Sequence, residues 1–301
     1  MPRSPALSRL LVLIVALGLP AALAGLLWKG APPPSLEVVS VRGDLVLLYG
    51  EGVYRYNPLM LGAGFPAQDA VLIVTLGVLA WGGFLRRRGR AEGSVVLLAA
   101  LGYLWYVYAS MSLGAALDWL FPVYVALFSA STFALWLAAR DALGEIDPAR
   151  MPGRGLVAFL LIAGAATFAI WAPSLLADLV AGRTPERLDT QTTKVTHALD
   201  LGLIVPLCVV AALGVRGGRA MGHVIALPLL GCLVGLFPWL VLATVLQVRA
   251  GVSFSPPEIV GPIAGFAILG LGAAWLLASA WRAMARGRGR VQRARESVAP
   301  F

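Results

Sequence analysis

Residues 69–85 read DAVLIVTLGVLAWGGFL, residues 86–90 read RRRGR, and residues 94–113 read SVVLLAALGYLWYVYASMSL. A helix crosses the hydrocarbon core of a bilayer with about 20 mostly apolar residues. Arginine collects at helix ends on the cytoplasmic side of a membrane. The stretch therefore predicts two antiparallel membrane-spanning helices joined by a short cytoplasmic turn.

The same alternation of long apolar runs and short arginine-rich turns continues along the whole chain. Of its 301 residues, 59% are hydrophobic and 13% are charged, whereas soluble domains carry about 25% charged residues. We predict an all-α membrane protein, a single transmembrane domain of eight helices. The predicted spans are 10–28, 69–85, 94–113, 118–139, 155–176, 198–215, 221–247 and 260–284, with long connections at 29–68 and 177–197.

The lysines and arginines are unequally divided between the two sides of these spans. The side that holds the N-terminus carries 17 of them and the other side carries 7. The positive-inside rule then places both termini in the cytoplasm and both long connections outside. We expect a multi-pass protein of the prokaryotic cytoplasmic (inner) membrane, and we assign the net charge of +9 to helix ends and not to nucleic-acid binding.

The first span has two interpretations. Ala22-Leu23-Ala24 resembles a signal-peptidase site, and cleavage there would leave seven helices. The apolar run continues to Trp28, which makes it long enough to span the bilayer. We expect an uncleaved anchor, with a cleaved signal peptide as the alternative.

The first outer connection carries a strand pattern. Residues 36–41 are rich in β-branched side chains, and Arg42-Gly43-Asp44 and Gly50-Glu51-Gly52 are turn sequences. We predict a sheet of two or three strands within 29–68. In a strand at 53–56, Tyr54 and Tyr56 would share one face and Arg55 would lie on the other.

Polar residues gather near the start of the helix predicted at 198–215. If that helix begins near residue 190, then Thr193, Thr196, His197 and Asp200 form one stripe at i, i+3, i+4 and i+7. Each helix that descends from the outer face also begins with an acid: Asp69, Asp118, Asp200 and Glu258. The helix dipole explains an acid at such a position, and convergence on a cation, a proton or a polar substrate is the other interpretation.

The helix at 94–113 carries Tyr103 and Tyr106, and Tyr108, which is expected to belong to an interfacial aromatic belt. The hydroxyl of Tyr103 would lie near the bilayer centre, where it needs a partner. The helix at 118–139 offers Tyr124 and three hydroxyl side chains at comparable depth. These residues predict either a polar pocket between the two helices or hydrogen bonds that serve packing alone.

No motif indicates a cofactor or a metal. His197 and His223 are expected at opposite sides of the membrane and cannot share a haem, and no lysine lies mid-membrane to bind retinal. Cys208 and Cys232 lie in apolar runs and are expected to be free thiols. Since no phosphate loop or hydrolase motif occurs, an enzyme is the less favoured class.

Four segments carry a resemblance to other proteins: residues 49–56, 106–116, 124–128 and 192–206. They resemble a group of uncharacterised prokaryotic integral membrane proteins. The resemblance implies an inner-membrane location and a multi-helix architecture, and it brings no activity, cofactor or catalytic residue.

Three functional hypotheses remain. The leading one is the binding or transport of a small polar ligand or lipid headgroup from the outer face. Asp200, His197, Thr196 and Asp69 would bind this ligand under a lid that carries Tyr54, Arg55 and Tyr56. The alternatives are an enzyme that acts on a lipid-linked substrate, with Asp200 and His197 as acid and base, and a structural partner of another membrane protein.

Overall fold

The computed structural model describes residues 4–296, with side chains up to residue 286. Its helices are α1 (Pro5–Leu27), α2 (Leu59–Arg87), α3 (Gly93–Gly114), α4 (Phe121–Leu143), α5 (Arg154–Val180), α6 (Val195–Leu199), α7 (Val205–Arg216), α8 (Ala220–Arg249) and α9 (Pro256–Glu296). A π-helical turn, η1 (Asp200–Ile204), joins α6 to α7.

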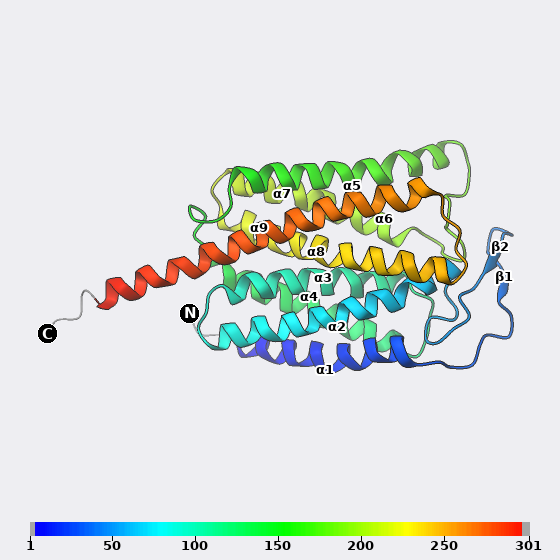
Figure 1. The fold of residues 1–301 in the computed structure, drawn as a ribbon, viewed down its shortest axis with the longest axis horizontal. Helices are drawn as coiled ribbons and strands as arrows, with labels where there is room; N and C mark the ends of the chain where they lie inside the picture. The colour runs from blue at the N-terminus through cyan, green and yellow to red at the C-terminus, as the bar shows by residue number, and fades with distance from the viewer. Residues whose placement is uncertain (1–3, 297–301) are drawn as a thin grey trace.

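The prediction of a helical membrane protein is confirmed. Eight helices in the described chain are long and apolar enough to cross a membrane, with α6, η1 and α7 forming one span, Val195–Arg216. The helices run side by side, and both strands lie beyond one end of the bundle (Figure 1). We call this the sheet end. The opposite end, where Arg86–Arg90 joins α2 to α3, is the arginine end.

The sheet has two antiparallel strands, β1 (Glu37–Val39) and β2 (Leu45–Leu47), with Val38 opposite Val46. The strand considered at 53–56 is wrong, because this segment is a turn. Gly50 and Gly52 precede it with φ of 78° and 58°, a conformation that favours glycine. As a result Tyr54 is 1% exposed and Tyr56 is 41% exposed, so they do not share a face.

Helix α2 begins at Leu59, whereas the sequence pattern predicted a start at residue 69. The extra segment is helical although it contains Pro66 and three glycines or alanines in succession, because it packs closely on α8. The Gln247 side chain of α8 donates a hydrogen bond of 2.9 Å to the carbonyl of Met60. Asp69 therefore lies inside a membrane-spanning helix and not at its start.

Helix α3 forms the centre of the bundle. Of its central apolar stretch, 83% is buried, against 17% for α9. Helices α2, α4 and α8 pack around it. A Cβ atom at Gly102 would collide with the backbone of Pro228, and one at Gly231 would collide with the backbone of Ala99. Small residues at these two positions let the α3 and α8 backbones come into contact, as is common between membrane helices.

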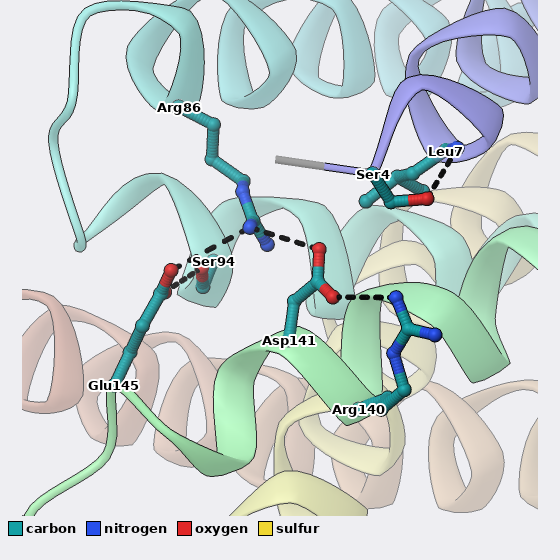
Figure 2. A network of polar contacts seen from close by, with 7 residues as sticks. All are labelled: Ser4, Leu7, Arg86, Ser94, Arg140, Asp141 and Glu145. Atoms are coloured by element: carbon teal, nitrogen blue, oxygen red, sulfur yellow. Dashed lines mark hydrogen bonds and ion pairs between the residues drawn. The ribbon is translucent and has the colours of Figure 1, made fainter. Parts of the chain in front are cut away.

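An ion-pair network ties three helices together at the arginine end (Figure 2). Arg86 of α2 contacts Asp141 at 3.2 Å and Glu145 at 3.5 Å, near the end of α4. Ser94, in the first turn of α3, donates to Glu145. Arg86 and Asp141 are 11% and 12% exposed, so the pair is largely withdrawn from solvent.

Replacing Arg86 by alanine should destabilise the bundle, because it leaves the largely buried Asp141 carboxylate with only the exposed Arg140, also at 3.2 Å, as a cation among the described residues. We expect the free energy of unfolding to fall by about 3 kcal/mol. The matched control is Arg150→Ala, which breaks a half-exposed pair with Asp147 and should cost less than about 1 kcal/mol. Unfolding in mild detergent, followed by circular dichroism, gives both values. Equal losses would show that the Arg86 network does not hold the helices.

Candidate functional site

The first polar cluster surrounds Asp69 of α2. The Tyr54 hydroxyl, from the connection between β2 and α2, donates a hydrogen bond of 2.6 Å to Asp69 Oδ2. The Tyr54 ring packs on Phe65 with a centroid distance of 4.8 Å. On the α1 side, Gly25 has no side chain, and a Cβ atom there would collide with Asp69 Oδ2 and lie 2.5 Å from the Tyr54 hydroxyl. Gly25 thus leaves the space that this hydrogen bond occupies.

Two more phenols complete this cluster. Tyr108 of α3 and Tyr124 of α4 are both buried. Tyr124 lies beside the Tyr54 hydroxyl, whereas the Tyr108 hydroxyl lies against Gly18 of α1, beside Leu76 of α2 and about two helical turns from Gly25 and Asp69. Burial raises the pKa of Tyr54 well above its ordinary value, and the neighbouring Asp69 and Tyr124 raise it further. Tyr54 and Tyr124 therefore lie at the Asp69 end of the cluster, and Tyr108 lies about two helical turns from the carboxylate.

The second polar cluster surrounds Asp200, the first residue of η1. The Tyr106 hydroxyl of α3 donates to Asp200 Oδ1 at 2.8 Å, and the Trp171 indole of α5 donates to Oδ2 at 2.7 Å. The His197 ring lies against the Trp171 ring with a centroid distance of 4.3 Å. His197 Nδ1 is buried and has no partner in the described part of the chain. Asp200 thus joins α3, α5 and the α6–α7 span.

The sequence predicted one ligand site at an outer mouth, with Asp69 and Asp200 together. The structure instead has two separate clusters, one around each acid. No hydrogen bond among the described residues joins Asp69 to Asp200. Helix α3 lies beside both clusters, since its Tyr106 donates to Asp200 and it packs against α2, which carries Asp69. The two acids therefore share one central helix without sharing a ligand-binding mouth.

The threonine stripe predicted around residues 193–200 does not form as expected. Helix α6 begins at Val195, so Thr193 precedes the helix. Thr193 and Thr196 are both exposed, whereas Asp200 is only partly exposed.

Asp118 and Glu258 support the helix-end interpretation of the acids. Asp118 Oδ1 accepts a 2.6 Å hydrogen bond from the Leu120 backbone N–H just before α4. Burial raises the pKa of Asp118, and the N–H groups of Leu120 and Phe121 partly offset this. Glu258, in the first turn of α9, accepts hydrogen bonds from the Ser255 backbone and hydroxyl.

The remaining predicted residues hold neighbouring chain segments. Arg55 donates to the Ala31 carbonyl at 3.1 Å and lies 4.9 Å from the centre of the Tyr56 ring. The Tyr103 ring packs where a Cβ atom of Gly235 in α8 would be, and its buried hydroxyl has no partner in the described residues. It is Trp105 that bonds across to α4, donating to Thr132 at 3.0 Å. The structure thus gives no α3–α4 hydrogen bond for Tyr103.

Sequence reasoning missed three residues of these clusters. Trp171 and Tyr108 each lie near a predicted helix end, where aromatic residues normally form an interfacial belt. Gly25 follows the signal-peptidase-like motif and carries no chemical group. The only unusual sequence feature near Trp171 is Pro173, two residues further along the same helix. A proline there does not predict that Trp171 donates a hydrogen bond to an acid.

Comparison with protein-family models, curated proteins and solved structures gave no match to this chain. In the described residues, no group of three or more His, Cys, Asp or Glu side chains is placed to hold a metal ion. The two acid clusters therefore have to be interpreted from their own geometry.

Adding a methyl group at Gly25 should break the Tyr54–Asp69 contact. Gly25→Ala forces the two oxygens apart, and overpacking of this kind costs about 1–3 kcal/mol. Gly77→Ala in α2 is the control, because a Cβ atom there meets no other atom within 4 Å. Thermal unfolding in detergent should show a lower Tm for Gly25→Ala and little change for Gly77→Ala. A Tm for Gly25→Ala equal to that of the wild type would contradict the close contact.

Proposed function

We propose that this protein binds and transports a small polar ligand, or binds a lipid headgroup, at the Asp200 cluster. The common chemistry of these ligands is a protonated amine. The sheet end faces outward and the arginine end faces the cytoplasm of a prokaryotic cell, as the distribution of lysine and arginine indicates. The observation that carries the proposal is a partly exposed carboxylate bound by two neutral donors inside a membrane-spanning segment.

The charge of the cluster favours a cationic ligand. No lysine or arginine in the described residues forms an ion pair with Asp200. An acid within a membrane span is costly and is usually retained for function. Tyr106 and Trp171 lie beside the carboxylate and the His197 ring packs on Trp171, and aromatic faces attract ammonium groups. An amine could therefore bind the carboxylate and the rings together.

The position of Asp200 favours transport over a fixed binding site. Its two hydrogen bonds connect α5 to α3, and the π-turn that begins at Asp200 interrupts the regular helix. Such turns are frequent at functional sites. A ligand that replaces Tyr106 or Trp171 on the carboxylate would remove one of the links between these helices, while the contact of Val195 with Gly114 at the end of α3 remains. Binding would then favour a second arrangement of these helices.

The geometry favours this function over acid–base catalysis. An acid and a base that act together lie within hydrogen-bond reach of one another or of the same proton. Both oxygens of Asp200 accept hydrogen bonds from other residues, and the His197 ring packs on Trp171. Among the described residues, no hydrogen bond connects His197 to Asp200.

Native mass spectrometry of the protein released from mild detergent tests this proposal. We expect the wild type to retain an amine-bearing small molecule or lipid, and Asp200→Asn to lose it because the amide carries no charge. Asp147→Asn is the matched control, since Asp147 is a half-exposed residue at the arginine end, and it should retain the ligand. Ligand-free wild-type protein that also gains no thermal stability from primary amines or from phosphatidylethanolamine would rule the proposal out.

A further inference from the structure

We infer that a hollow between α5 and α9, at the arginine end of the bundle, binds the phosphate headgroup of an anionic phospholipid. The hollow has a volume of about 290 Å³. Its walls come from the α4–α5 connection, from the first turn of α5 and from α9, and they include Arg150, Gly153, Gly155, Leu156, Trp275 and Ser279. The site goes beyond the proposed function, because it takes a phosphate and lies apart from the Asp200 cluster.

The hollow exists because α5 and α9 separate toward the arginine end. Further inside the bundle the two helices touch, and a Cβ atom added to Gly272 of α9 would lie 2.8 Å from the Phe159 ring of α5. One helical turn closer to the start of α5, a Cβ atom at Gly155 would meet no other atom within 4 Å. Helix α9 crosses the bundle obliquely and continues past its arginine end (Figure 1). The two helices therefore leave an open space where α5 begins.

The first argument is charge. Arg150 lines the hollow and is half-exposed, and Asp147 contacts its Nε at 2.9 Å. On the α9 side, Arg282 donates to the Ser279 hydroxyl at 3.3 Å, and no acid pairs with Arg282 among the described residues. Two guanidinium groups thus face one carboxylate. Arginine binds phosphate through paired, charge-assisted hydrogen bonds, so a phosphate would balance the remaining positive charge.

The second argument is the backbone at the start of α5. The first N–H groups of a helix have no partner within it and attract anions. Gly153 caps α5 and has no side chain to accept from them, and Gly153, Gly155 and Leu156 all line the hollow. The buried His223 of α8 lies 3.0 Å from the Pro152 carbonyl. Since a carbonyl can only accept, His223 Nε2 donates, and this bond fixes the connection that carries the donors.

The third argument concerns the apolar wall, which favours a lipid over a free anion. Trp275 lines the hollow, is 63% exposed and belongs to the membrane-spanning part of α9, Pro256–Arg286. Leu156, which is buried, lines the α5 side. Tryptophan is enriched where acyl chains meet headgroups. A lipid with its phosphate at Arg150 would therefore place its acyl chains along Trp275, in the leaflet at the arginine end.

Thermal unfolding in detergent with added dihexanoyl-phosphatidylglycerol tests this site. This lipid carries a phosphate and no amine, so the Asp200 cluster should not bind it. We expect a saturable rise in Tm for the wild type, a much smaller rise with dihexanoyl-phosphatidylcholine, and none with inorganic phosphate at the same ionic strength. Arg150→Gln should weaken the apparent affinity about tenfold, the effect of about 1.4 kcal/mol. Gly155→Leu, which fills open space, should weaken it at least as much.

Two control variants should keep the wild-type response. Arg183→Gln removes an exposed arginine that pairs with Asp178 at the sheet end, and Asp200→Asn removes only the proposed amine site. A wild-type Tm that does not respond to phosphatidylglycerol would overturn the inference, as would a full response in both Arg150→Gln and Gly155→Leu. An equal response to inorganic phosphate would overturn the lipid assignment, and an equal response to phosphatidylcholine would overturn the role of charge. Loss of the amine ligand alone would refute only the proposed function.

Discussion

The contact between the backbones of α3 and α8 is the constraint on which the rest of the structure depends. It exists because Gly102 and Gly231 lack side chains where Pro228 and Ala99 approach. With α8 on one side and α2 and α4 on the others, α3 has little contact with lipid. Its tyrosine hydroxyls consequently point into protein, and each needs a polar partner there. Both acid clusters include a tyrosine of this helix.

Buried acids have different kinds of partner at the two ends of the bundle. At the arginine end, Asp141 and Glu145 face Arg86, and Glu92 pairs with Arg90 at 2.7 Å. Toward the sheet end, Asp69 and Asp200 accept hydrogen bonds only from neutral tyrosine and tryptophan donors among the described residues. A paired charge at a helix end holds helices in place. An acid without a cation inside a span retains its capacity to bind one, and for this reason the proposed amine site lies toward the sheet end.

The eight spans were predictable because the apolar runs are long and the arginines separate them. The site was less predictable because its geometry depends on where helices start. Pro66 and the neighbouring small residues conceal that α2 begins at Leu59, and this start is what places Asp69 within a span. A late start at Val195 leaves Thr193 outside the helix, and the Thr193 and Thr196 side chains are exposed whereas Asp200 is only partly exposed. Trp171 and Gly25 have roles that only tertiary contacts reveal.

Helix α3 lies beside both clusters. Tyr103 and Tyr106 lie less than one helical turn apart, and Tyr106 donates to Asp200 while Tyr103 packs on Gly235 of α8. An amine bound at Asp200, as proposed, would change the charge beside α3. The close contact with α8 fixes the position of α3. The segments that can move when a ligand binds are therefore those that pack beside α3. These are the Tyr54 connection, and α5 with the α6–α7 span. Each has a carboxylate contact and also a second link at the end of α3, from Asn57 to the Ala116 N–H and from Gln191 to the Gly114 carbonyl. Occupancy of the carboxylate would therefore change one link while the other still holds the element near α3.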